Sequence, residues 1–176
     1  MARSEREKAV REFLASHPFN RRNISDREVE LFDIALTHDS HANEEAQAGR
    51  IKESYERLEF LGDAVMDLAV CEYIYSKTQL NEGEMTIFKN MMVSNANISS
   101  RILVSGIDID DHLLVGVGHK DKRTGANVIE ENMRADAFEA LLGAAYTLYG
   151  IDEARRIIYE MFMDPQQDAG ASSRQQ

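Results

Sequence analysis

The chain has 176 residues, 43% of them hydrophobic, which suits a single soluble domain with a sizeable core. Its formal charge of −11 argues against a general nucleic-acid binder with a basic surface, but not against an enzyme that meets phosphates through a bound metal. No apolar run is long enough to span a bilayer, and the N-terminus lacks an apolar signal core. The single cysteine, Cys71, can form no internal disulfide. We therefore expect a soluble cytoplasmic protein with no membrane partner.

Helical periodicity dominates the chain, and the alternation and hairpin dipeptides of strands are absent. The spacing of Ser25 and Glu28 is that of a capping box and predicts the start of an amphipathic helix. A polar stretch over 38–53 is expected to connect this helix to a longer one over 54–77.

The second half of the chain is also expected to be helical. Asn81 is predicted to cap one long segment that ends at Gly106. A glycine-bearing loop over 116–125 precedes a helix expected over 127–149, and Asp152 is expected to cap the last helix.

The composition changes near the C-terminus, where Pro, Gln, Gly and Ser replace the periodic apolar residues. We interpret 165–176 as a disordered polar tail and 1–164 as one domain. The predicted fold class is all-α.

Carboxylates interrupt the apolar pattern of the 54–77 helix. At about 100° per residue, Glu56, Glu59, Asp63 and Asp67 fall on one face, which we call the acid stripe. Like charges at this spacing cost roughly 0.2–0.5 kcal/mol per pair, and a divalent cation would reverse the sign of that cost. Phe60 projects beside these acids, so the core of its own helix cannot easily bury it.

A second acid pair, Asp136 and Glu139, occupies one face of the 127–149 helix. Gly143 projects onto the same face, where its missing side chain would allow another helix to come close. If the two helices pack there, four carboxylates form an oxygen-only site that suits Mg²⁺ or Mn²⁺. Two such ions can promote phosphodiester hydrolysis. The alternative is that both acidic faces are simply solvated.

Four segments resemble the motifs of the ribonuclease III family of double-stranded-RNA endonucleases. The segment Glu-Arg-Leu-Glu-Phe-Leu-Gly-Asp-Ala-Val at 56–65 is similar to the family signature. The segments at 35–40 and 81–86 resemble the motifs before and after it, and 134–144 resembles the second catalytic block. Their order and separations agree with the family over most of 10–162.

The resemblance implies that Glu59, Asp63, Asp136 and Glu139 are the catalytic residues and metal ligands, with Mg²⁺ as cofactor and Mn²⁺ as a possible substitute. It implies a homodimer in which each subunit cuts one strand of double-stranded RNA. The products would carry 5′-phosphate and 3′-hydroxyl ends with short 3′ overhangs, and the role would lie in RNA processing.

Other residues receive roles from the same resemblance. Glu56 and Glu82 match acids that the family places near the site. Phe60 matches an aromatic residue that enters a pocket of the other subunit in family dimers. The alternative for Phe60 is an ordinary core position.

The sequence departs from the family in places. Tyr55 stands where the family usually has Asn, Asp39 replaces a residue that is often basic, and neither is expected to touch the four ligands. Most bacterial members carry a double-stranded-RNA-binding domain after the nuclease domain, where this sequence has only 165–176. A natural single-domain form and a shortened form both remain open.

The densest basic patch lies in the loop at 119–123. Its residues Lys120, Lys122 and Arg123 are candidates for contact with RNA phosphates, and the alternative is a solvated loop.

Three other functions remain open. One is an interaction module that binds RNA without cutting it. Another is a metal phosphohydrolase built on His38 and Asp39 with further histidines, although His38 also suits a polar position at a helix end. The third is an acidic helical dimerisation domain without chemistry.

Overall fold

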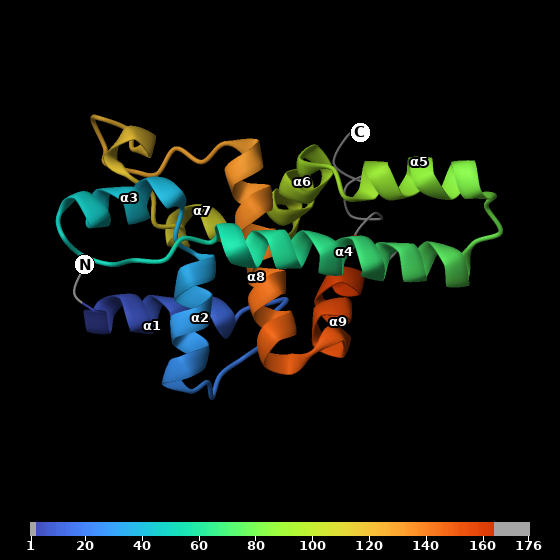
Figure 1. Ribbon diagram of the computed structural model, residues 1–176, viewed down its shortest axis with the longest axis horizontal. Coiled ribbons are helices and arrows are strands. Elements are labelled where there is room, and N and C mark those ends of the chain that lie inside the picture. The colour runs from blue at the N-terminus through green and yellow to red at the C-terminus, as the bar shows by residue number, and fades with distance from the viewer. Residues whose placement is uncertain (1–2, 164–176) are drawn as a thin grey trace, which may run out of the picture.

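The computed structural model describes residues 3–163, and the tail expected over 165–176 lies outside them. The elements in the described part are α1 Arg3–Leu14, α2 Asp26–Ala35, α3 Asp39–Gln47, α4 Glu56–Lys77, α5 Glu82–Met92, α6 Asn95–Ser105, α7 Ile109–His112, the 3-10 helix η1 Val117–His119, α8 Glu131–Tyr149 and α9 Ile151–Phe162 (Figure 1). Over the same residues β-structure is limited to two isolated bridges. The all-α prediction is confirmed.

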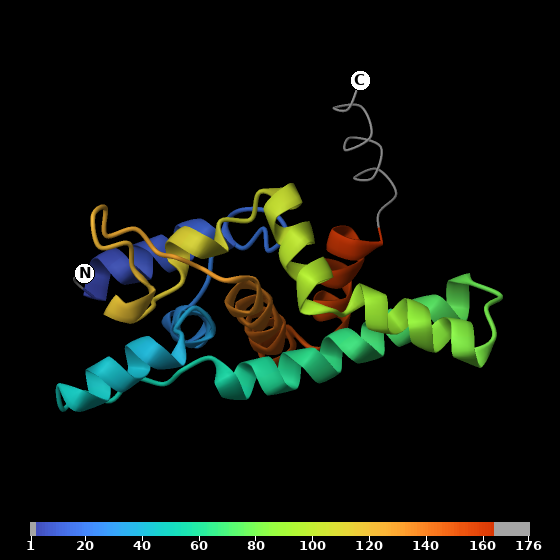
Figure 2. The same cartoon turned by 90° about the horizontal axis from the view of Figure 1, so that it is seen from above.

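Helix α8 forms the centre of the fold. Residues 137–145 are all buried, and Glu139 is the one charged residue among them. α8 packs against α2, α4, α6, α7 and α9, and the pair with α4 is the most extensive. Seen from above, α8 lies between α4 on one side and α6 and α7 on the other (Figure 2).

Two glycines bring α4 and α8 into backbone contact where they cross. A Cβ atom at Gly62 would lie 1.7 Å from the carbonyl oxygen of Glu139, and one at Gly143 would lie 2.2 Å from the carbonyl oxygen of Leu58. Any side chain at either position would force the helices apart. The expectation that Gly143 allows close approach of a helix is confirmed, and Gly62 is its partner on α4.

Helix ends follow local chemistry at several predicted positions. The Ser25–Glu28 capping box is present, and Asn81 caps α5 in a second capping box. Gly106 ends α6 with φ of 73°, in the left-handed conformation that glycine adopts readily.

Two of the predicted segments are wrong in outline. The stretch over 38–53 is not only a connection, because α3 forms within it and none of its residues is buried. A helix without a buried face shows no apolar period, so the sequence pattern could not reveal it. The segment from Asn81 to Gly106 is two helices, because Ser94 caps α6 by accepting a hydrogen bond from the Asn97 amide.

Two predicted helix starts are also wrong. α8 begins at Glu131 rather than at 127, because the Asn127 side chain instead donates to the carbonyl oxygens of Asp110 and Leu113. Asp152 does not cap α9. It lies in the first turn, where it accepts from Arg155, and Gly150 takes the N-cap position.

The helices over residues 3–163 are too short or too polar to cross a bilayer.

Candidate metal centre

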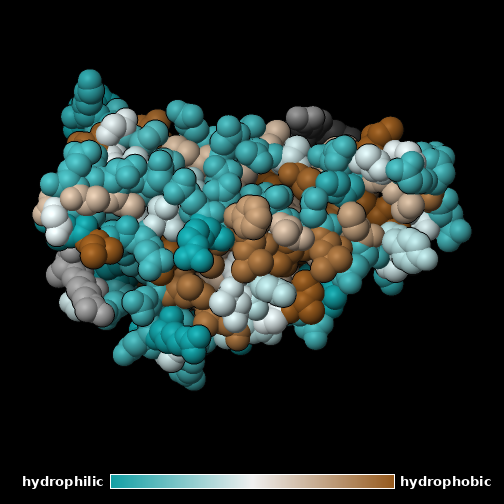
Figure 3. All heavy atoms as spheres, in the orientation of Figure 1, coloured by the Kyte–Doolittle hydropathy of each residue, from teal (hydrophilic) through white to brown (hydrophobic). Residues whose placement is uncertain are grey.

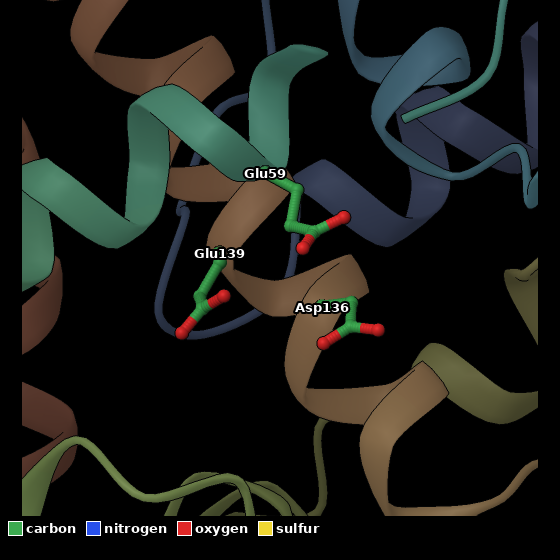
Figure 4. Close-up of side chains that lie close together, drawn as sticks. All are labelled: Glu59, Asp136 and Glu139. Carbon is green, nitrogen blue, oxygen red and sulfur yellow. The ribbon is translucent and has the colours of Figure 1, made fainter. Parts of the chain in front are cut away.

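Three carboxylates from two helices meet beside the α4–α8 crossing. Glu59 comes from α4, and Asp136 and Glu139 lie one turn apart on α8 (Figure 4). One carboxylate oxygen from each of the three lies within 4.8 Å of the others. We call this group the carboxylate cluster. It forms because the two glycines let the backbones touch, so that acids far apart in the sequence face one another.

Asp63, the fourth acid that the resemblance selects, is exposed and lies outside the cluster's 4.8 Å limit. It is nevertheless close, because its charge raises the pKa values of both Glu59 and Glu139. Asp63 therefore lies near the carboxylate cluster on its solvent side. The structure brings the four acids into one neighbourhood, and their roles as ligands stay a prediction.

Burial and mutual repulsion disfavour the charged forms of the cluster. Burial and then the charges of Asp63, Asp136 and Glu59 raise the pKa of Glu139 to about 8. Burial and then the charges of Asp136, Glu56 and Asp63 raise the pKa of Glu59 to about 7. Burial also raises the pKa of Asp136.

The donor set fits a hard divalent cation. The charges that raise the pKa values of Glu59 and Glu139 all belong to carboxylates. The negative charges at the site therefore repel one another. Clustered carboxylate oxygens are the ligands that Mg²⁺ and Mn²⁺ prefer. A cation would favour the ionised carboxylates and remove the repulsion.

Tyr55 contacts the site, contrary to the sequence expectation. Its buried side chain lies close enough to Asp136 to lower the pKa of that carboxyl, opposing the effect of burial. The Tyr55 amide donates to the Thr37 carbonyl oxygen at 2.8 Å, and its ring packs edge-on against His38 with centroids 5.4 Å apart. The expectation was wrong because only the fold shows that the loop before α4 reaches α8.

The two supporting acids lie in different places. Glu56 is exposed at the start of α4, accepts a hydrogen bond from the Ser54 hydroxyl at 3.0 Å, and helps to raise the pKa of Glu59. Glu82 starts α5 and lines the same groove as Cys71. Cys71 follows Glu59 by about 18 Å along α4. Within one chain Glu82 is therefore away from the cluster, and its role stays a prediction.

Phe60 points away from the core of its own chain. Its side chain is 81% exposed, which agrees with the helical projection that placed it beside the acids. Its role in a dimer stays a prediction.

The basic loop has a defined conformation. Lys120, Lys122 and Arg123 are exposed. The Asp121 carboxylate accepts hydrogen bonds from the Arg123 amide at 3.0 Å and from the amide and hydroxyl of Thr124 at 2.7 and 2.8 Å. The loop therefore presents its cations to solvent, and contact with RNA stays a prediction.

The histidines do not assemble a metal site. Among the described residues, the group of side chains close enough to share a cation contains only carboxylates. His38 caps α3, where its Nδ1 accepts from the Ser40 amide at 3.1 Å. His112 and His17 instead lie beside Asp108 and Glu160. The structure thus gives no support to the phosphohydrolase alternative.

Comparison with known proteins gives consistent matches. Residues 28–166 match the family model described as Ribonuclease-III-like. Ribonuclease 3 of Onion yellows phytoplasma (strain OY-M) is 34% identical over 145 residues, which are 82% of this chain and 57% of that protein. Ribonuclease 3 of Pelotomaculum thermopropionicum is 38% identical over 136 residues, 77% of this chain and 54% of that protein. The chain thus spans little more than half the length of these relatives.

A solved structure agrees as well. The nuclease domain of ribonuclease III from Campylobacter jejuni, described for structural flexibility in the region involved in dimer formation, superposes with a TM-score of 0.63 at 26% identity. The match covers 90% of this chain and 97% of that one. Together with the family match, this shows that the chain belongs to the ribonuclease III-like family and has the fold of its nuclease domain.

Proposed function

We propose that this protein is a divalent-metal-dependent endoribonuclease that hydrolyses the backbone of double-stranded RNA in RNA processing. The observation that carries the proposal is the α4–α8 crossing, which gathers Glu59, Asp136 and Glu139 within 4.8 Å beside Asp63. Membership of the family and the ribonuclease names of its relatives support the same activity.

The four acids would hold Mg²⁺, with Mn²⁺ as a substitute. Glu59, Asp136 and Glu139 would hold it from the buried side and Asp63 from the solvent side. When bound, the metal would activate water and stabilise charge on the leaving oxygen, giving 5′-phosphate and 3′-hydroxyl ends. Tyr55 would orient Asp136 by donating a hydrogen bond to it, as outer partners of metal ligands do.

The substrate would be recognised by shape. A duplex of A-form RNA offers its phosphates and 2′-hydroxyls in a regular geometry, whatever its base sequence. Lys120, Lys122 and Arg123 are the exposed cations proposed to meet those phosphates. Because the chain as a whole is strongly acidic, binding should be weak and should decrease steeply with salt.

We propose that the active form is a homodimer built on α4. Phe60, Leu68 and Tyr75 form an apolar face on this helix, with exposed fractions of 81%, 50% and 81%. Hydrophobic side chains gather over the middle of the molecule in the view of Figure 3, where α4 crosses it. Such a face on one helix is typical of a contact with another chain.

An apolar groove of about 250 Å³ lies at the far end of the same helix, between α4 and α5. It is lined by Cys71, Ile74, Tyr75, Glu82, Met85, Thr86 and Lys89. If two copies of α4 pack antiparallel about a two-fold axis, Phe60 of each can enter the groove of the other. Two sites, each cutting one strand, would leave short 3′ overhangs. The free, exposed Cys71 thiol is consistent with a cytoplasmic location, which belongs to the same proposal.

The test is cleavage of a labelled duplex RNA by Glu139→Gln. The variant should fold and should cut at least a hundredfold more slowly in Mg²⁺, because it removes a charged ligand without changing side-chain volume. Glu30→Gln, which changes an exposed glutamate on α2, is the matched control and should cut at the wild-type rate.

Two outcomes would contradict the proposal. Wild-type rates in Glu139→Gln would reject the site. A wild-type protein that binds duplex RNA without cutting it, at every Mg²⁺ or Mn²⁺ concentration, would instead favour the interaction module.

A further inference from the structure

The acid stripe on α4 extends past the carboxylate cluster to Asp67, one turn beyond Asp63. Asp67 is not part of the carboxylate cluster, and it forms an ion pair with Lys89. The Lys89 amine on α5 donates to both of its carboxylate oxygens, at 3.1 and 3.0 Å. Of the four carboxylates on the stripe, Asp67 is thus the one in an ion pair with a lysine.

Lys89 is placed between the acids and the apolar groove. Its side chain is 24% exposed and lines the groove, while its amine reaches across to α4. Its charge faces more than one acid, because both Asp67 and Asp63 raise the pKa of Lys89. Asp67 in turn is close enough to the cluster to help raise the pKa of Glu139. The ion pair therefore borders the cluster.

We infer that Lys89 is a positioning residue that ends the acid stripe at Asp63 and, through its ion pair with Asp67, sets how tightly the site holds a divalent cation. This inference rests on the proposed function, because it assumes that the carboxylate cluster binds metal. The paired residues carry no net charge, so the cation interacts mainly with the remaining acids. Loss of either partner leaves one uncompensated charge at the edge of the site.

Opposite effects of the two single substitutions follow from this charge balance. Lys89→Met leaves Asp67 negative and should tighten Mn²⁺ binding, whereas Asp67→Asn leaves Lys89 positive and should weaken it. With a divalent ion about 6–9 Å from the unpaired charge and water-like screening, each change should be roughly five- to tenfold. The double variant restores neutrality and should bind Mn²⁺ within about twofold of the wild type, as two compensating charge changes should.

The experiment is a titration of the full chain with Mn²⁺. Binding is measured by calorimetry and, independently, by the electron paramagnetic resonance signal of free Mn²⁺. Lys89→Arg keeps the positive charge and should retain wild-type affinity. Arg155→Met is the matched control, since it leaves Glu72 of α4 without the guanidinium that holds it at 3.0 Å. Glu72 lies about 14 Å beyond Asp63 along the helix, so this change should alter affinity less than twofold.

A merely structural role for the ion pair gives a different pattern. Both single variants would then weaken Mn²⁺ binding, and that result, or no change in either, would overturn the inference while leaving the proposed site intact. A wild-type protein that binds no Mn²⁺ would reject both the site and the inference. Melting temperatures show which variants fold, and Lys89→Gln replaces Lys89→Met if the methionine variant does not.

Discussion

Gly62→Ala is the most demanding test of how the site is assembled. The added methyl group would lie 1.7 Å from the Glu139 carbonyl oxygen and 2.5 Å from its carbonyl carbon. Both are backbone atoms in the middle of a buried helix, so no side-chain rotation can relieve the overlap. α4 must therefore move away from α8 by more than about 1 Å at the crossing.

Gly62→Ala has two opposing effects on the free energy of unfolding, a gain in helix propensity and a loss from overpacking. Alanine is favoured over glycine inside a helix by about 0.5–1 kcal/mol. Overpacking a buried contact costs about 1–3 kcal/mol, and an immovable backbone partner places this case at the upper end. The expected net loss in the free energy of unfolding is about 2 kcal/mol. For a domain of this size, the melting temperature should then fall by about 4–8 °C.

Gly83→Ala is the matched control for the same measurement. Gly83 also lies in a helix, but its added methyl group would be 3.5 Å from the Asn81 side chain, an ordinary contact. This variant should gain up to about 1 kcal/mol from helix propensity alone. A Gly62→Ala protein that melts at or above the wild-type temperature would refute the close crossing.

Gly62→Ala also tests whether the helix crossing sets the geometry of the metal site, apart from its effect on stability. Because the crossing brings the Glu59 oxygens to those of Asp136 and Glu139, moving the helices apart should weaken Mn²⁺ binding by at least tenfold. Gly83→Ala should leave Mn²⁺ affinity unchanged. Unaltered affinity in a destabilised Gly62→Ala protein would show that the glycine contact does not set the spacing of the carboxylates.

Further predictions concern pH, Tyr55 and the dimer. Because the folded pKa values of Glu59 and Glu139, about 7 and 8, exceed their ordinary 4.5, the contribution of these two carboxyls to metal-free stability should be full below pH 4.5 and should fall by a few kcal/mol up to about pH 8. In thermal melts the wild type should therefore lose more stability than Glu139→Gln as pH rises above 4.5, and parallel profiles of the two proteins would contradict the assignment. Tyr55→Phe should weaken Mn²⁺ binding about tenfold, whereas Tyr149→Phe, which loses a hydrogen bond to a carboxylate elsewhere, should not. Phe60→Ala should shift sedimentation toward the monomer at low concentration, and an unchanged dimer would count against its role.

Much of the local structure was determined by the sequence itself. Ser25 and Asn81 start helices because their side chains accept hydrogen bonds from amides three residues later, a pattern that needs no tertiary partner. The exposure of Phe60 followed from its angular position on α4. Elements without such signals were missed: α3 has no buried face, and Ser94 breaks a segment whose apolar positions continue on both sides.

The carboxylate cluster likewise depends partly on the sequence and partly on the tertiary structure. Residue spacing placed Glu59 and Asp63 on one helix face and Asp136 and Glu139 on another, because a helix repeats every 3.6 residues. Whether those faces meet depends on how α4 and α8 cross, and that is decided by two glycine contacts between residues about eighty positions apart. The partners of Asp67 and Asp136 were likewise settled by packing, since Lys89 and Tyr55 reach them from another helix and from a loop. Helical periodicity fixes which residues share a face, and only tertiary contact determines what that face meets.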